Sequence, residues 1–235
     1  MPLASLRIFF NKRHTICNCG KLMVEYEIVS WDQSYQMTFY LFEKMAEDNY
    51  YPDIIVGIAR GGWIPARLLA DFYGNRRTAN IKIEFYNNTS RASDNPIITQ
   101  EISEKVENKV VLIVDDVADS GKSLIAAVEH IEEMGAKEIR TATLYYKKHS
   151  IIKPEYYINE TEAWIVYPWE YGEFAAFQYE ELKGKMPIKE IRRKIKDIGI
   201  PPPLVDTYFT LIKDKLSDEE TNNELRKQRR CGITY

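Results

Sequence analysis

Short apolar runs alternate with amphipathic stretches through the middle of the chain. Continuous apolar runs at residues 54–58 and 110–114 are typical of strands that a parallel sheet buries on both faces. Each is followed by apolar residues at helical spacing, over residues 64–73 and about 122–134. Strands that alternate with helices in this way predict an α/β fold with a mostly parallel central sheet flanked by helices on both faces.

Further segments extend this pattern in both directions. Ser30 and Gln33 have the spacing of a capping box, and the apolar residues after them predict a first amphipathic helix. Strands are expected at residues 81–85 and 139–145, and a further apolar stretch covers residues 164–167. The carboxyl ends of such parallel strands are where ligands of α/β sheets bind.

The remaining segments suggest how the chain is organised. Residues 1–22 are basic and irregular and are expected to form a flexible leader, followed by one domain over residues 23–180. Residues 86–100 show neither period and predict a long loop, which in a compact domain is usually functional or disordered. Residues 181–235 are expected to form a helical extension, whose polar end at residues 217–230 predicts a solvated helix or disorder.

Charge and composition exclude several classes of protein. The formal net charge of −3 over 235 residues leaves no electrostatic footprint for nucleic acid. No apolar stretch is long enough to span a membrane, and no secretory signal opens the chain, so we expect a soluble cytoplasmic protein without a membrane partner. The three cysteines argue against a disulfide framework, and Cys17 and Cys19 with His14 fall short of a four-ligand zinc site.

The segment after the strand at 110–114 carries the strongest functional signal. Asp115 and Asp116 follow the strand directly, and the small residues at 118–123 open the next helix. Carboxylates accept sugar hydroxyls, while the amides at a helix N-terminus bind phosphate. An ordinary capped corner would explain Asp119, but not carboxylates at all three positions. The segment therefore predicts a site for a ribose 5-phosphate group.

An ATP-binding loop is the competing interpretation of this segment. Gly121, Lys122 and Ser123 match the end of the Walker pattern Gly-x-x-x-x-Gly-Lys-Ser/Thr. The pattern also requires a glycine five residues before Gly121, where the chain has Asp116. This departure disfavours an ATP-dependent enzyme.

A second candidate anion site follows the strand at 54–58. Arg60 can bind a phosphate group through two parallel hydrogen bonds, and Gly61 and Gly62 allow the backbone to approach an anion closely. A turn that merely needs flexible residues would give the same glycines. Beside the segment at 115–123, however, a second anion site suits a substrate with phosphate groups at both ends.

These two motifs resemble, in order and in residue type, those of the type I phosphoribosyltransferases. The resemblance implies the fold of that family, with a small hood and a C-terminal helical tail. It implies that Arg60, Gly61 and Gly62 bind pyrophosphate, and that Asp115 and Asp116 bind the ribose hydroxyls directly or through Mg2+. The 5-phosphate would be held by the turn of Ala118, Asp119, Ser120, Gly121, Lys122 and Ser123.

A third motif resembles the hood of the xanthine and hypoxanthine/guanine branch, and the layout looks similar to archaeal purine members. It runs from Ala163 to Glu170, and the resemblance implies that Trp164, Ile165 and Glu170 bind the purine. Lys147 stands where that branch has a lysine for the exocyclic oxygen of the base, although the neighbouring Lys148 leaves the assignment open. Of the two tryptophans in the motif, one is expected to belong to the core.

The implied reaction transfers ribose 5-phosphate from phosphoribosyl pyrophosphate to a 6-oxopurine, namely hypoxanthine, guanine or xanthine, and belongs to purine salvage. In this scheme Asp119 acts as acid or base near the purine nitrogen, and Arg60 stabilises the leaving group. Mg2+ is the implied cofactor and a homodimer the implied assembly. The alternative from another class is a regulatory protein of the same fold that senses phosphoribosyl pyrophosphate or a nucleotide without catalysis.

Overall fold

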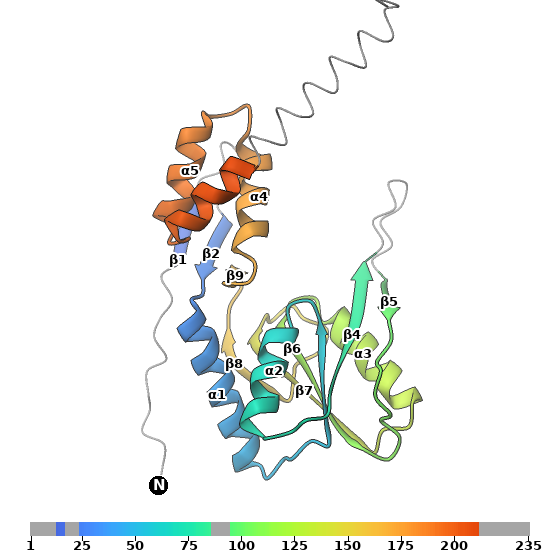
Figure 1. Cartoon of the computed structure of the whole chain (residues 1–235). Helices are drawn as coiled ribbons and strands as arrows, with labels where there is room; N and C mark the ends of the chain where they lie inside the picture. Colours follow the sequence, from blue (N-terminus) through green and yellow to red (C-terminus); the bar gives the residue numbers. More distant parts are fainter. Residues whose placement is uncertain (1–12, 17–23, 86–94, 212–235) are drawn as a thin grey trace, which may run out of the picture. The chain divides into compact units, whose positions relative to one another are not determined.

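The computed structural model describes residues 13–16, 24–85 and 95–211, and the chain divides into two compact units. The sheet unit comprises Ser30–Ala163, and the helical unit comprises Met1–Val29 with Trp164–Tyr235. The elements of the sheet unit, in chain order, are α1 (Trp31–Glu47), β3 (Ile54–Ala59), α2 (Trp63–Phe72), β4 (Thr78–Phe85), β5 (Pro96–Gln100), β6 (Val110–Ala118), α3 (Lys122–Glu133), β7 (Glu138–Tyr146) and β8 (Tyr156–Glu160) (Figure 1).

One six-stranded sheet organises the sheet unit, with the strand order β5-β4-β3-β6-β7-β8. Its neighbouring strands are parallel except for β4 and β5. The predicted α/β fold with a mostly parallel central sheet is therefore confirmed. Since β3 and β6 are neighbours, the two apolar runs that the sequence marks as buried strands lie side by side at its centre.

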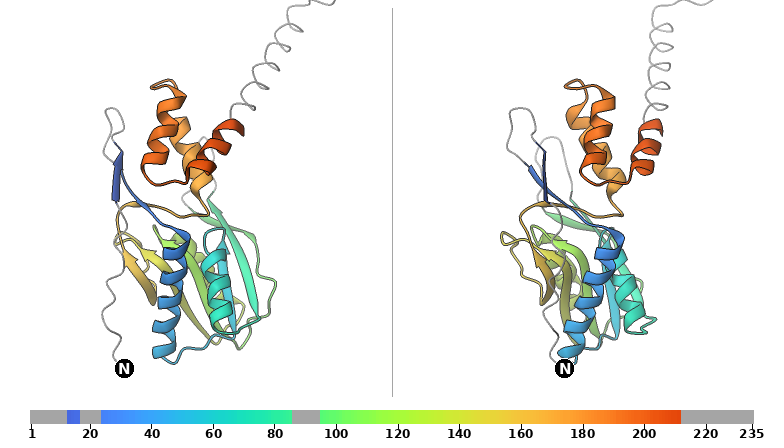
Figure 2. Two further views of the ribbon diagram at one scale, coloured as in Figure 1. Left: turned by 60° about the vertical axis from the view of Figure 1, so that its left-hand side comes forward. Right: turned by 90° about the vertical axis from the view of Figure 1, so that its left-hand side faces the viewer.

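The two faces of the sheet are covered by different helices. Ile54 and Val56 of β3 belong to the same apolar cluster as the inward residues of α3, such as Leu124. Successive strand residues point to opposite faces, so Gly57 faces away from α3. A Cβ at Gly57 would lie 3.0 Å from the Cβ of Ala66, which places α2 on that second face. Figure 2 shows α1 and α2 running beside each other over it.

The start of α1 confirms the predicted capping box. The Ser30 Oγ accepts a hydrogen bond from the Gln33 N–H at 3.2 Å, and the Gln33 side chain accepts one from the Ser30 N–H at 2.8 Å. Two amides that the first turn would otherwise leave unpaired are satisfied in this way. Local sequence therefore determines where this helix begins.

The helical unit is built from a small sheet and a group of helices. Strands β1 (Arg13–Ile16), β2 (Val24–Ile28) and β9 (Trp164–Val166) form the sheet in the order β1-β2-β9. Helices α4 (Tyr171–Leu182) and α5 (Ile188–Asp197) and a helical segment at residues 202–211 pack around one apolar core (Figure 1). The core residues of α5 are Ile191 and Ile195, in agreement with the helical spacing predicted there.

Two predicted element boundaries are wrong. The strand predicted at 110–114 continues to Ala118, because the parallel register with β7 pairs Asp115 with Thr143 and Ala118 with Tyr146. The loop predicted at 86–100 contains strand β5, which pairs with β4 at the edge of the sheet. An edge strand with mostly exposed or half-buried side chains shows no apolar alternation, so the sequence gives little sign of it.

Other expectations concern residues outside the described ranges. These are the remainder of the loop at 86–94, the polar end of the chain from residue 212, and Cys17, Cys19 and Cys231. Within the described residues, the structure adds β1, β2, β8 and α4, which the sequence pattern did not predict. No helix in this part of the chain is long and apolar enough to cross a membrane.

Candidate active site

The centre of the sheet is a topological switch point. From β3 the chain passes over one face through α2 to β4, and from β6 it passes over the other face through α3 to β7. The two connections diverge, so the carboxyl ends of β3 and β6 lie at the position where α/β proteins usually bind ligands. Residues 60–62 and residues 115–121 lie at these two ends. The structure thus brings together both candidate anion sites.

Gly61 and Asp116 connect the two strand ends directly. A Cβ at Gly61 would lie 2.1 Å from Asp116 Oδ2 and 2.6 Å from Asp116 Oδ1, so a side chain there has no room. Asp116 is only 6% exposed, whereas the neighbouring Asp115 is half-buried and accepts a hydrogen bond from the Asp116 N–H at 3.0 Å. A buried carboxylate against a glycine backbone fixes the spacing of the two loops.

Close packing also explains the second glycine of the first loop. A Cβ at Gly62 would lie 2.3 Å from the Val114 carbonyl oxygen and 2.7 Å from that of Ile58. The peptide bond between Ala59 and Arg60 is cis, and the Arg60 side chain is exposed. The loop therefore holds its backbone tightly against β6 and presents its arginine outward.

The turn at residues 118–123 leads into α3. Gly121 has φ +80° and is the N-cap residue of the helix, so it supplies no side-chain cap, and the first turn has no acidic residue. The Lys122 N–H donates to Ser120 Oγ at 3.4 Å. A Cβ at Gly121 would lie 2.4 Å from Ser150 Oγ, so the turn packs against the segment after β7. Gly121, the glycine of the apparent ATP motif, is thus needed for this packing. The amides at such a helix N-terminus also suit an anion.

Asp119 is held by two basic side chains, and these contacts bring Lys147 into the site. Lys147 Nζ lies 2.8 Å from Asp119 Oδ2, and His149 Nε2 lies 2.8 Å from Asp119 Oδ1. The Lys147 N–H also donates to the Ala118 carbonyl at 3.0 Å. Lys147 and His149 follow Asp119 by 28 and 30 positions in the sequence. They meet it here because β6 and β7 end side by side.

The same contacts shift two pKa values in opposite directions. Partial burial alone would raise the pKa of Asp119, but the hydrogen bonds and positive charges of Lys147 and His149 outweigh it and lower that pKa. The pKa of His149 is raised by its hydrogen bond to Glu162, whose Oε2 lies 2.9 Å from His149 Nδ1, and by its bond to Asp119. The site therefore favours an ionised Asp119 beside a protonated His149.

His149 and Glu162 were missed by the sequence-based prediction. Neither residue belongs to a recognisable motif, and their distance from Asp119 along the chain hides the contact. The only available signal was the expectation that neighbouring parallel strands end at one edge of the sheet.

The residues predicted to bind the purine lie, apart from Lys147, in the helical unit. Trp164 is 41% exposed, with its ring centre 4.7 Å from that of Phe177, and Ile165 is buried. Trp169 is half-buried and stacks on Tyr167 with 4.6 Å between ring centres. The expectation that one tryptophan belongs to the core is wrong, because the buried aromatic residue of this motif is Tyr167. The purine contacts of Trp164, Ile165 and Glu170 stay predictions.

The residues of the sheet unit fit a divalent cation only in part. In the described ranges no three His, Cys, Asp or Glu residues gather as a metal site. Asp115 and Asp116 offer the hard oxygen atoms that Mg2+ prefers, and Mg2+ is commonly held by one or two carboxylates together with substrate phosphates and water. These two carboxylates therefore suit a cation that arrives with its substrate.

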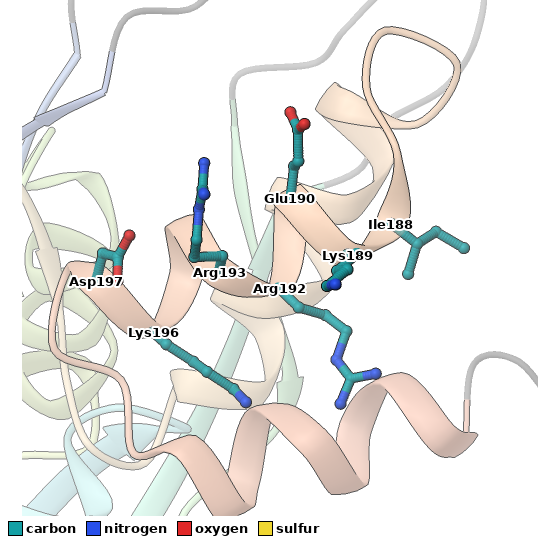
Figure 3. A pocket seen from close by; sticks show the side chains of 7 residues that line it. All are labelled: Ile188, Lys189, Glu190, Arg192, Arg193, Lys196 and Asp197. Atoms are coloured by element: carbon teal, nitrogen blue, oxygen red, sulfur yellow. The ribbon is translucent and has the colours of Figure 1, made fainter.

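A groove of about 820 Å³ on α5 lies outside these loops, in the helical unit. Figure 3 shows Arg192 and Lys196 pointing from α5 toward the helical segment at 202–211, where both contact Asp206, at 2.5 and 2.6 Å. Arg193 and Glu190 point to the other side of the helix. Arg192 and Lys196, two of the basic side chains that line the groove, are thus already paired with Asp206. The positive charge that they bring to the groove therefore has a structural explanation.

Comparisons with known proteins identify the family to which the chain belongs. Residues 27–174 match the phosphoribosyl transferase domain family, and the chain belongs to that family. It is 30% identical over 158 residues to the xanthine-guanine phosphoribosyltransferase of Cereibacter sphaeroides, covering 65% of this chain and 89% of that protein. It is 26% identical over 180 residues to the hypoxanthine-guanine phosphoribosyltransferase of Schizosaccharomyces pombe, covering 60% and 87%.

Solved structures show the same relationship. The purine phosphoribosyltransferase from Pyrococcus horikoshii is 40% identical, with a TM-score of 0.56 over 61% of this chain and 93% of that one. The resemblance to purine type I phosphoribosyltransferases noted from the motifs is therefore confirmed.

The packing at Gly121 can be tested by substitution. Gly121→Ala should lower the free energy of unfolding by more than Gly135→Ala, by about 1 kcal/mol or more, because only Gly121 is crowded by Ser150. Gly135 has a similar φ of +81° and its nearest neighbour is 3.5 Å away, so it serves as the control for backbone strain. Urea denaturation of both variants measures the difference, and equal losses would contradict the packing argument.

Proposed function

We propose that the protein is a purine phosphoribosyltransferase that converts phosphoribosyl pyrophosphate and a 6-oxopurine into the nucleoside monophosphate and pyrophosphate. The observation that carries this proposal is the close packing of Gly61 against Asp116, which joins the two candidate anion-binding loops at one switch point. A substrate with pyrophosphate on one side of a ribose and phosphate on the other suits such a pair of loops. The names of the relatives support the choice of a 6-oxopurine.

The residues of the two loops take complementary roles in this reaction. The bond from the sugar carbon to pyrophosphate breaks, the bond to a purine nitrogen forms, and that nitrogen loses its proton. Arg60 and the amides around it stabilise the negative charge of the departing pyrophosphate. Asp115 and Asp116 hold the ribose hydroxyls, residues 118–123 hold the 5-phosphate, and Asp119 accepts the purine proton.

Mg2+ would be held by Asp115 and Asp116, directly or through the ribose hydroxyls. When bound, it neutralises charge on the pyrophosphate oxygens and so assists their departure. The two carboxylates also keep the ribose in one orientation relative to the turn at 118–123.

The two lysines proposed for the purine oxygen differ in exposure and in their contacts. The Lys147 side chain is 11% exposed and directed at Asp119, whereas the Lys148 side chain is 73% exposed and pairs with Glu160 at 2.9 Å. These contacts support Lys147 as the residue that meets the exocyclic oxygen of the base. We retain Trp164, Ile165 and Glu170 as the proposed purine-binding residues of the helical unit.

The proposed activity predicts nucleotide formation from a defined set of bases. Purified protein with Mg2+ and phosphoribosyl pyrophosphate should form nucleotide with at least one of hypoxanthine, guanine and xanthine, and much less with adenine or orotate. Chromatographic detection of the nucleotide measures the outcome. Binding of phosphoribosyl pyrophosphate without product from any base would instead indicate a sensor.

The role of Asp119 predicts a separation between chemistry and binding. Asp119→Asn keeps the size of the side chain but removes its charge and basicity, so kcat should fall about 100-fold or more. The Kd for phosphoribosyl pyrophosphate, measured by calorimetry, should change little. Glu160→Gln, a similar change outside the two loops, is the control. Equal losses of kcat and affinity would contradict a role in proton transfer.

We also propose that the protein forms a homodimer, supported by an exposed aromatic surface on α1 and α2. Trp31, Tyr35 and Phe39 on α1 are 56%, 51% and 38% exposed, and Trp63 on α2 is 46% exposed. Tyr35 and Phe39 pack edge-on against Phe72, with ring centres 5.4 and 5.5 Å apart. An exposed apolar patch of this kind is typical of a surface that a partner covers.

The dimer predicts a change of mass on substitution. The double variant Tyr35→Glu with Phe39→Glu should elute as a monomer while the unchanged protein elutes as a dimer, because buried unpaired carboxylates oppose association. Light scattering coupled to size-exclusion chromatography measures both masses. Ile188→Glu, on an exposed residue of the helical unit, is the matched control. A monomeric unchanged protein would refute the proposal.

A further inference from the structure

The contacts of Asp119 are divided between its two oxygen atoms. Lys147 Nζ contacts Oδ2 and His149 Nε2 contacts Oδ1, each at 2.8 Å. The proposed reaction directs Lys147 to the exocyclic oxygen of the base, which would leave Oδ2 open toward the purine nitrogen. His149 has no such second task and can stay on Oδ1.

We propose that His149 is a positioning residue, which together with Glu162 holds Oδ1 of Asp119 and orients Oδ2 toward the purine proton. This inference rests on the proposed function, because it concerns the carboxylate assigned to proton transfer there. It adds to that function a chain of Glu162, His149 and Asp119 that no sequence motif marks. No proton needs to travel along the chain for it to act.

The backbone around His149 is fixed well enough for this role. The Ser150 N–H donates to the Lys147 carbonyl at 2.9 Å, and the Ile151 N–H donates to the Ser120 carbonyl at 3.0 Å. The turn that carries His149 is therefore tied to the turn that carries Asp119. On its other side, Glu162 is fixed in turn, since its Oε1 accepts a hydrogen bond from the Lys148 N–H at 3.0 Å.

The exposure of the chain argues against a purely stabilising role. The side chains of Asp119, His149 and Glu162 are 54%, 54% and 59% exposed. Ion pairs so accessible to water contribute little to the stability of a fold. An arrangement in which both ring nitrogens of a histidine are engaged by carboxylates therefore calls for an explanation at the site itself.

The charged groups around His149 determine the sign of its effect. Asp119 faces it from the end of β6 and Glu162 from the segment after β8, while Lys147 contacts Asp119 and Lys148 pairs with Glu160. The two carboxylates raise the pKa of His149, and the imidazolium contributes to the lowered pKa of Asp119. Removing His149 should consequently raise the pKa of Asp119.

Three variants separate positioning from charge. His149→Ala should lower kcat about tenfold or more at neutral pH, because misplacing a reacting group slows the reaction, with little change in the KM for phosphoribosyl pyrophosphate. The acidic limb of the kcat profile should move to higher pH, since activity is lost as Asp119 becomes protonated. His149→Gln can still donate a hydrogen bond to Oδ1, so it should recover most of kcat while the shifted acidic limb remains. Glu160→Gln is the matched control.

A second measurement does not depend on turnover. NMR titration of the His149 ring protons should give a pKa above the ordinary value of about 6.5, lowered by Glu162→Gln but not by Glu160→Gln. An unchanged kcat and acidic limb in His149→Ala, or a His149 pKa insensitive to Glu162→Gln, would overturn the inference in an active enzyme. Absence of turnover in the unchanged protein would refute the proposed function instead, and the catalytic role of His149 with it.

Discussion

The contact between Gly61 and the buried carboxylate of Asp116 is the constraint on which the candidate site depends. A backbone without a side chain allows the loop after β3 to lie against the end of β6, with no space for even a methyl group. Gly57, within β3, performs a related task, because its lack of a side chain allows α2 to approach the sheet. Small residues thus bring two strand ends and a helix close together at the candidate anion-binding site. The proposed role of Arg60 depends on this packing, because the loop that carries Arg60 is held against the end of β6 through Gly61.

The parallel register of β6 and β7 adds the second half of the site in the sheet unit. Pairing continues to Ala118 and Tyr146, so β6 and β7 end at the same level of the sheet. The next residues, Asp119 and Lys147, therefore meet although 28 positions separate them. The extra strand length beyond Val114, which local hydropathy did not predict, carries Asp115 and Asp116 within the strand. Their backbones are held by the sheet rather than by a loop.

Much of this could be predicted from the sequence, and the omissions have physical reasons. Buried central strands show as continuous apolar runs, and the glycines and carboxylates at their ends show as motifs because each residue type is required locally. The edge strand β5 was not predicted, because its side chains are exposed or half-buried and show no apolar period. His149 and Glu162 escape because their role arises only from contacts across the sheet edge. Tyr167 is buried where a tryptophan was expected, and hydropathy alone does not show which aromatic residue of the motif is buried.

The electrostatics of Asp119 impose a sequence of events on the proposed reaction. A carboxylate held by Lys147 and His149 favours the ionised form and is weakly basic, because these partners lower its pKa. A proton acceptor works best when its pKa is close to the pH of the solution. One partner of Asp119 therefore has to withdraw as the purine binds. Lys147 is the partner with another destination in the proposed complex. Its departure would raise the basicity of Asp119 at the moment when the purine nitrogen arrives, which couples recognition of the exocyclic oxygen to removal of the proton.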